Sequence, residues 1–104
     1  MARKPRSGPA SDPEILILAS LAAGSKHGYA IMADVEDFAG VVLGPGTLYT
    51  AITRLVEKGF IAAEASDGRQ RPYRLTPKGT ASLRELLTDM RRVATAGLRR
   101  LKTV

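Results

Sequence analysis

Three elements follow one another in residues 44–79, and their order constrains this chain more than any other feature. The first is a helix over about residues 47–58, introduced by Gly-Pro-Gly and stopped by Gly59, because glycine commonly follows the last turn of a helix. One of its faces is apolar and consists of Leu48, Ala51, Ile52, Leu55 and Val56. The opposite face is polar, so this helix has one side for a core and one side for solvent or a partner.

A β-hairpin and a long helix come next. Residues 60–65 and 70–75 are predicted to be short strands, since the turn at 66–69 contains Asp-Gly, a strong hairpin signal between apolar runs. Thr76 then caps a final helix that begins at Pro77. This order predicts a mainly α fold with a small β-hairpin, namely a winged helix-turn-helix followed by a long C-terminal helix.

Two further helices are predicted upstream. Ser11 and Glu14 have the spacing of a capping box, which would start a helix that runs to about Ala23. A second helix, with an apolar stripe at helical spacing, is expected over residues 27–39. The chain therefore has three expected parts: a flexible basic tail at 1–10, a winged helix-turn-helix domain at 11–76 and a dimerisation helix at 77–104.

Composition narrows the class of protein. The net charge of +6 suits a polyanionic partner such as DNA. The absence of cysteine excludes disulfides and thiolate metal sites, and with one histidine no metal or cofactor is expected. No apolar run approaches the roughly 18 residues of a membrane span, and the basic N-terminus lacks a signal-peptide core. We expect a cytoplasmic protein that is not an enzyme, because the sequence shows no nucleophile–base pair and no phosphate-binding Gly-Lys-Ser/Thr loop.

The polar face of the helix at 47–58 suits the major groove of DNA, which admits one α-helix. Small side chains let the backbone come close, threonine hydroxyls can bond phosphates or base edges, and arginine can contact guanine or a phosphate. An ordinary solvated helix face is the alternative. The residues expected to contact DNA here are Gly46, Thr47, Tyr49, Thr50, Thr53 and Arg54.

Two other places are candidates for DNA contact. The hairpin carries Arg69, Gln70, Arg71 and Arg74. Arginines at such a position can reach the phosphate backbone or the adjacent minor groove, although charge that protects a sheet edge is the alternative. Tyr29, at the start of the second helix, can present its hydroxyl to a phosphate or cover the edge of the core.

The last helix carries an apolar seam whose residues recur at alternating spacings of four and three, which is typical of helices that pair with one another. The seam is too long for the small domain to cover, and the first helix is apolar nearly all the way round. We therefore expect both helices to form a dimer interface, in preference to a helix that lies on a membrane surface. The predicted dimer residues are Ile15, Leu18, Leu83, Leu87, Met90, Ala94, Leu98 and Leu101.

Five short motifs occur in a specific order over about residues 14–83. They are His-Gly-Tyr-Ala-Ile at 27–31, Gly-Thr-Leu-Tyr at 46–49, Arg-Leu at 54–55, Lys-Gly-Phe-Ile at 58–61 and Tyr-Arg-Leu-Thr-Pro-Lys-Gly at 73–79. Together they resemble the PadR family of bacterial transcriptional regulators, in the form with a single C-terminal helix. The resemblance implies a homodimer that represses at a roughly palindromic operator and is usually released by a small molecule or a stress signal.

The same resemblance implies DNA contact near Tyr29, around Thr47, Tyr49, Thr50 and Arg54, and on the hairpin arginines. Effector sites in some relatives lie between the subunits, but the chain has no tryptophan and only two phenylalanines, so an effector is left open. A winged-helix interaction or assembly module without specific DNA readout is the alternative function. A MarR-like regulator is disfavoured by the Thr-Leu-Tyr and Thr-Pro-Lys-Gly motifs.

Overall fold

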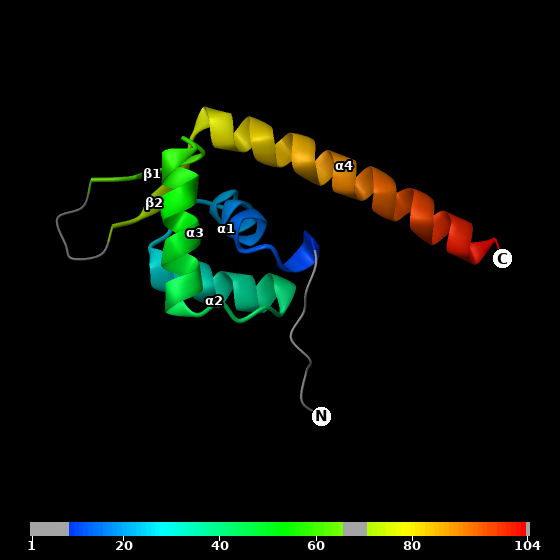
Figure 1. Cartoon of the computed structure of the whole chain (residues 1–104), viewed down its shortest axis with the longest axis horizontal. Coiled ribbons are helices and arrows are strands. Elements are labelled where there is room, and N and C mark those ends of the chain that lie inside the picture. The colour runs from blue at the N-terminus through cyan, green and yellow to red at the C-terminus, as the bar shows by residue number, and fades with distance from the viewer. Residues whose placement is uncertain (1–8, 66–70, 104) are drawn as a thin grey trace, which may run out of the picture.

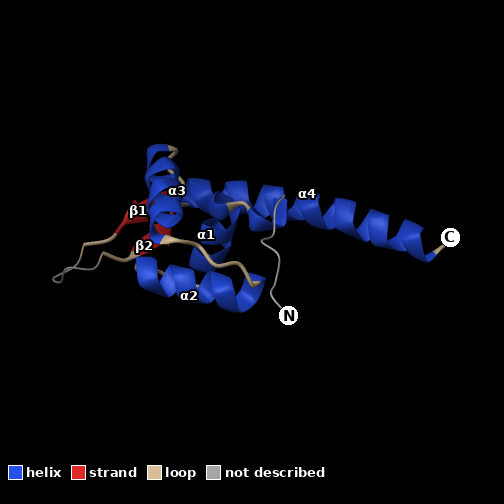
Figure 2. Cartoon of the chain, turned by 60° about the horizontal axis from the view of Figure 1, so that its bottom comes forward, coloured by secondary structure: helices blue, strands red, loops and turns tan. Residues whose placement is uncertain are grey.

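The computed structural model describes residues 9–65 and 71–103, and it confirms a mainly α fold with one small hairpin (Figure 1). Figure 2 shows the hairpin at one edge of the helices, beside α3, and α4 projecting to the opposite side. The elements in chain order are the short 3-10 helix η1 (Pro9–Ser11), α1 (Pro13–Leu21), α2 (Gly28–Ala39), α3 (Pro45–Glu57), β1 (Ile61–Ala63), β2 (Tyr73–Leu75) and α4 (Pro77–Lys102). Residues 9 and 10, expected in the tail, therefore belong to η1, and residues 1–8 lie outside the described part.

The helix α1 is the centre of the domain. It packs against α2, α3, α4 and β2, and it buries Leu16, Ile17, Leu18 and Leu21. Its apolar character on nearly every side is thus explained largely within one chain. Leu18, predicted to face a partner subunit, lies in the core of its own domain, whereas Ile15 stays partly exposed.

The start of α1 differs from the prediction by one residue. Asp12, and not Ser11, is the N-cap, and its carboxylate accepts hydrogen bonds from the backbone N–H groups of Glu14 (2.9 Å) and Ile15 (3.3 Å). Aspartate caps helices as well as serine does, and its charge also suits the positive end of the helix dipole. This shift places Pro13 at the first helical position, where its missing N–H costs nothing.

The helix α3 has the predicted two-sided character. It begins at Pro45 and not at 47, and it buries Leu48, Ala51, Ile52 and Leu55. Val56 is 44% exposed, so the apolar face is one residue narrower than predicted. The stop at Gly59 is confirmed, since its φ of 77° lies in the left-handed region that favours glycine.

The hairpin is shorter than predicted but lies in the predicted place. The strands β1 and β2 pair antiparallel, with Ile61 opposite Leu75 and Ala63 opposite Tyr73, and residues 66–70 lie outside the described part. The linker between α1 and α2 forms a single antiparallel β-bridge with β2, because Lys26 and Tyr73 exchange backbone hydrogen bonds of 3.1 and 2.8 Å. The hairpin, which we call the wing, is therefore tied to the helix-turn-helix.

The helix α4 starts at its predicted cap and then leaves the domain. The Thr76 hydroxyl accepts a hydrogen bond from the Gly79 backbone N–H at 3.0 Å, as predicted. Gly79 and Leu83 are the only buried residues among those described in α4, and the helix extends away from the other helices (Figure 1). The predicted seam residue Leu83 thus belongs to the core of the domain, whereas Leu87 is 40% and Leu101 is 73% exposed.

Candidate nucleic-acid interface

The outward side of α3 carries all six residues predicted to contact DNA from this helix. They are exposed, and they lie along two edges of the helix. One edge runs along the side facing the start of α1 and the other along the side facing the start of α2. We call this set the reading face: Gly46, Thr47, Tyr49, Thr50, Thr53 and Arg54.

The edge of the reading face that carries Arg54 borders a shallow groove, whose other wall includes Asp12 and Glu14 at the start of α1. Both carboxylates are engaged within the chain: Asp12 caps α1, and Glu14 lies 2.6 Å from the Lys58 ammonium. Arg54 is exposed and forms no hydrogen bond or ion pair with another described residue. Its guanidinium is therefore available to an external acceptor.

The other edge of the reading face touches the start of α2. Tyr49 is 48% exposed, and a Cβ added at Gly28 would overlap its hydroxyl. Glycine at 28 therefore leaves room for the Tyr49 side chain at the start of α2, which gives the glycine of the His-Gly-Tyr motif a physical reason. Thr53 donates its hydroxyl hydrogen to the Tyr49 carbonyl at 2.9 Å, which leaves its hydroxyl oxygen able to accept a further hydrogen bond.

The side chain of Tyr29 projects into solvent from the start of α2. It is 71% exposed in the first turn of α2, directly after the Gly28 contact. The N-cap of this helix is His27, whose Nδ1 accepts from the Ala30 backbone N–H at 3.5 Å. The exposure of Tyr29 removes the alternative in which its ring covers the core edge, and it leaves the hydroxyl open to a phosphate.

The wing contributes two described arginines. Arg71 and Arg74 are exposed, and neither forms a hydrogen bond or ion pair with another residue of the described ranges. Arg74 alternates with Tyr73 and Leu75, which pack against the core cluster, so its side chain points away from the core. The other two predicted wing residues, Arg69 and Gln70, lie outside the described residues.

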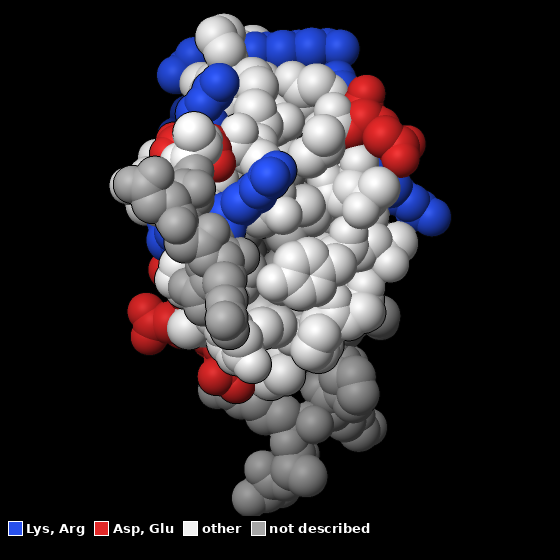
Figure 3. Space-filling model, turned by 90° about the vertical axis from the view of Figure 1, so that its left-hand side faces the viewer, with Lys and Arg blue, Asp and Glu red and all other residues white. Residues whose placement is uncertain are grey.

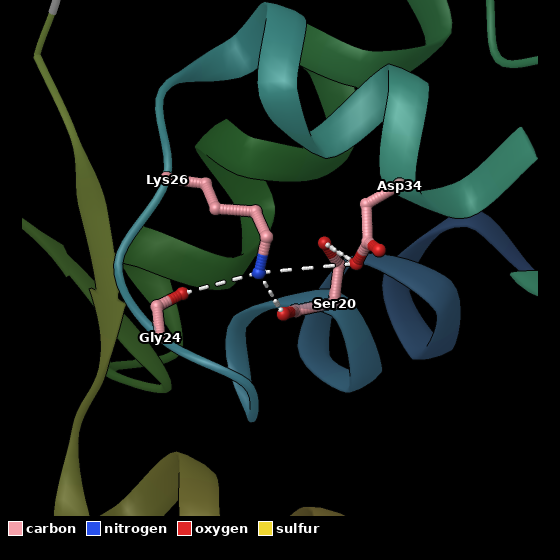
Figure 4. Close-up of polar contacts among 4 residues, drawn as sticks. All are labelled: Ser20, Gly24, Lys26 and Asp34. Carbon is pink, nitrogen blue, oxygen red and sulfur yellow. Dashed lines mark hydrogen bonds and ion pairs between the residues drawn. The ribbon is translucent and has the colours of Figure 1, made fainter. Parts of the chain in front are cut away.

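A cluster around Lys26 fixes the wing relative to the helices (Figure 4). The Lys26 ammonium donates to the Ser20 carbonyl at 2.6 Å and to the Gly24 carbonyl at 3.4 Å, and it lies 3.8 Å from Asp34 Oδ2. The buried hydroxyl of Ser20 donates to the same carboxylate oxygen at 2.7 Å. Because the backbone of Lys26 pairs with Tyr73, one residue joins α1, α2 and the wing.

Sequence reasoning missed this cluster. The one local signal was a serine after the apolar run of α1, which needs a polar partner when it is buried. The partners, Lys26 and Asp34, lie on a loop and on the next helix, and no spacing rule joins them.

Viewed from the side of the wing, the molecule presents mostly uncharged side chains, with Lys and Arg mainly in the upper half of the view (Figure 3).

In the described ranges, no cluster of three or more His, Asp or Glu side chains is arranged to hold a metal ion. None of the helices described here has the length and apolar character needed to cross a membrane.

Comparison with known proteins identifies the family. Residues 17–85, from α1 into α4, match the model of the Transcriptional regulator PadR-like family. The chain belongs to this family. The resemblance seen in the sequence is therefore confirmed.

One curated relative is an uncharacterized 37.1 kDa protein in transposon TN4556 of Streptomyces fradiae. It is 43% identical to this chain over 84 residues, which cover 81% of this PadR-like protein. The matched part makes up 24% of the relative, so the chain spans about a quarter of that protein's length.

Solved structures of PadR family regulators share the fold. One from Clostridium difficile R20291 is 28% identical, with a TM-score of 0.75 over 86% of this chain and 97% of that one. One from Eggerthella lenta is also 28% identical, with a TM-score of 0.73 over 88% and 82% of the two chains. Bacillus subtilis PadR, solved in complex with operator DNA, is 25% identical, with a TM-score of 0.65 over 76% of this chain and 48% of that one.

Proposed function

We propose that this PadR-like protein is a cytoplasmic homodimeric repressor that binds a roughly palindromic DNA operator through the reading face, Tyr29 and the wing arginines. The observation that carries the proposal is the exposed Arg54, which has no partner among the described residues and lies beside small polar side chains on α3. Arginine of this kind is the commonest reader of guanine in the major groove. The operator complex of Bacillus subtilis PadR, a relative of the same fold, supports DNA as the ligand.

The proposed surface divides into a centre and a margin. Threonines and Tyr49 give the reading face a mostly uncharged centre that suits base edges, while Arg71 and Arg74 on the wing suit phosphates. At the N-terminal end of α3, the backbone N–H groups of Gly46 and Thr47 have no partner among the described residues, and no side chain caps the helix. Such N–H groups bind phosphate oxygens readily.

The helix α4 supports the dimer. It spans 26 residues, or about 39 Å, of which only the first turns are covered by the domain. Beyond them Leu87, Val93, Leu98 and Leu101 are exposed, Ala94 is exposed, and Met90 is half-buried. A helix with this much uncovered apolar surface suits pairing with a second copy, which would join two reading faces.

Release by a small-molecule or stress signal completes the proposal. A groove at the base of α4 is lined by apolar, hydroxyl and basic side chains, namely Ala22, Leu75, Leu83 and Leu87, Thr80 and Thr88, and Arg84 and Arg91. Such a groove suits a small anion with an apolar body. A compound that releases DNA from the wild type but not from Arg84→Met would support this location, and equal release from both would exclude it.

Selection from a random DNA library tests the proposed function. We expect a palindrome whose half-sites lie about one helical turn apart, bound roughly 10³-fold or more tightly than scrambled DNA. Absence of enrichment, with binding that disappears in moderate salt, would instead favour the interaction or assembly module without specific DNA readout.

A further inference from the structure

The segment after the wing holds the end of α3 through three consecutive backbone carbonyl groups. The Lys78 ammonium donates to the Lys58 carbonyl at 2.9 Å, and the Thr76 hydroxyl donates to the Gly59 carbonyl at 2.6 Å. The Thr76 backbone N–H donates to the Phe60 carbonyl at 3.0 Å. Every carbonyl group from 58 to 60 is therefore bonded to the cap or the first turn of α4.

Close packing accompanies these bonds. Gly79 is buried, and a Cβ at this position would overlap the Phe60 carbonyl group. The Lys78 ammonium also lies 5.5 Å from the centre of the Phe60 ring, within the range of a cation–π contact. The Thr76 hydroxyl serves two helices at once, since it accepts from the Gly79 N–H of α4 while donating to the carbonyl group after α3.

We call this set of residues the junction: Lys58, Gly59 and Phe60 with Thr76, Pro77, Lys78 and Gly79. It holds the base of α4, which otherwise packs against α1 and β2, and among the described residues of α4 only Leu83 is buried beyond the first turn. The direction in which α4 leaves the domain therefore depends on the junction and on the packing of Leu83. The end of α3 and the start of α4 lie close together (Figure 1), so the junction connects the helix that carries the reading face to α4.

We propose that the junction sets the spacing and relative rotation of the two half-sites that a dimer accepts, with Thr76 and Lys78 as positioning residues. The proposal rests on the dimeric DNA-binding function proposed above. Each base pair inserted between half-sites rotates one of them by about 34° relative to the other. A dimer whose α3 and α4 are held at one angle accepts one spacing, whereas a loosened junction accepts several.

Four variants of the full chain test the junction. Thr76→Val removes the hydroxyl and keeps the branched shape, while Thr76→Ser keeps the hydroxyl. Lys78→Met removes the ammonium and keeps the apolar stem. Lys102→Met is the matched control for lost charge, because Lys102 is exposed in the last turn of α4 and has no partner among the described residues.

Affinity is measured for the selected operator, for one half-site and for operators with one base pair inserted or removed between the half-sites. We expect Thr76→Val and Lys78→Met to keep half-site affinity and to lose about tenfold of the roughly 10²–10⁴-fold advantage of the full operator. They also bind the altered spacings nearly as well as the original. Thr76→Ser and Lys102→Met keep the wild-type preference. A loss shared equally by the half-site and every spacing would overturn the proposal.

A measurement without DNA separates this proposal from the proposed function. The chain has no cysteine, so spin labels can be placed at Thr47→Cys in α3 and Arg99→Cys in α4, with excess unlabelled chain to isolate distances within one subunit. We expect a narrow distance distribution with Thr76 or Thr76→Ser and a broad one with Thr76→Val, at unchanged helix content. Narrow distributions throughout would overturn the junction even if operator binding is confirmed. Broadening without any operator preference in the wild type would support the junction and overturn the repressor.

Discussion

The two ends of α3 differ in how completely their backbone groups are bonded. At the N-terminal end, no side chain caps the helix, and the N–H groups of Gly46 and Thr47 have no partner among the described residues. Directly after the C-terminal end, the carbonyl groups of residues 58–60 are all bonded by the segment that starts α4. The N-terminal end of α3 can therefore bind a ligand, while its C-terminal end is held against the start of α4. A binding helix that is held rigidly at one end keeps its other end in a defined position.

The largest expected effect comes from separating two reading faces. Leu87→Glu together with Leu101→Glu places charges on the exposed seam of α4, and we expect the operator affinity to fall by roughly 10²–10⁴-fold because the second half-site is lost. Sedimentation should show a monomer whose thermal unfolding is little changed, since both residues lie outside the core. A double variant that remained a dimer would remove the seam from the proposed interface.

The two ends of α3 can be compared by adding one methyl group beside each, at Gly46 at the start of α3 and at Gly79, which packs against Phe60 after its end. Gly79→Ala forces a Cβ against the Phe60 carbonyl, and we expect a loss of about 1–3 kcal/mol in the free energy of unfolding, or more. Gly46→Ala meets nothing within 4 Å, so we expect a gain of up to about 1 kcal/mol in stability and weaker operator binding. Denaturant titration and operator titration of both variants measure these effects. Equal losses of stability in the two variants would contradict the proposed difference between the two ends of α3.

A smaller effect is expected from the reading face itself. Arg54→Ala should cost about 1–3 kcal/mol of operator binding and relax the base preference at one position of each half-site. The folding stability should not change, because Arg54 has no partner among the described residues. Library selection repeated with the variant gives the preference at each position. An unchanged pattern would assign Arg54 to a phosphate or to solvent.

The smallest effect is expected at the wing. Arg71→Ala should weaken operator and random DNA alike and reduce the slope of log affinity against log salt by about 0.9, the value for one phosphate contact. Glu85→Ala, an exposed change on α4, serves as a control for a point mutation away from this surface. A slope for Arg71→Ala equal to that of the wild type would remove this residue from the phosphate contacts.

Local signals in the sequence predicted much of the fold. The cap at Thr76, the stop at Gly59 and the place of the hairpin were all correct, because each depends on a few adjacent residues. The exposure of the reading face also followed from the helical spacing of its apolar residues. The cap of α1 was misplaced by one residue, since Ser11 and Asp12 are equally good caps and local rules do not separate them.

Contacts between distant residues were not predictable in this way. Leu18 and Leu83 were assigned to a dimer from their helical pattern, which shows that a face is apolar but not what covers it; both are buried within the chain. The Lys26 cluster and the junction were also missed. Their donors and acceptors lie on different elements, so neither periodicity nor a short motif joins them.

The sequence by itself determined the type and order of the elements, their stops and the polar face of α3, because backbone conformation and amphipathicity arise within a few turns of chain. Only the tertiary structure decided which apolar faces close the core and which polar groups tie the elements together. Glu14 meets Lys58 across 44 residues, and Lys78 meets the Lys58 carbonyl across 20. Such pairs form only when packing of the core brings the elements together. They hold α3, which carries the reading face, in a defined position relative to α1 and α4.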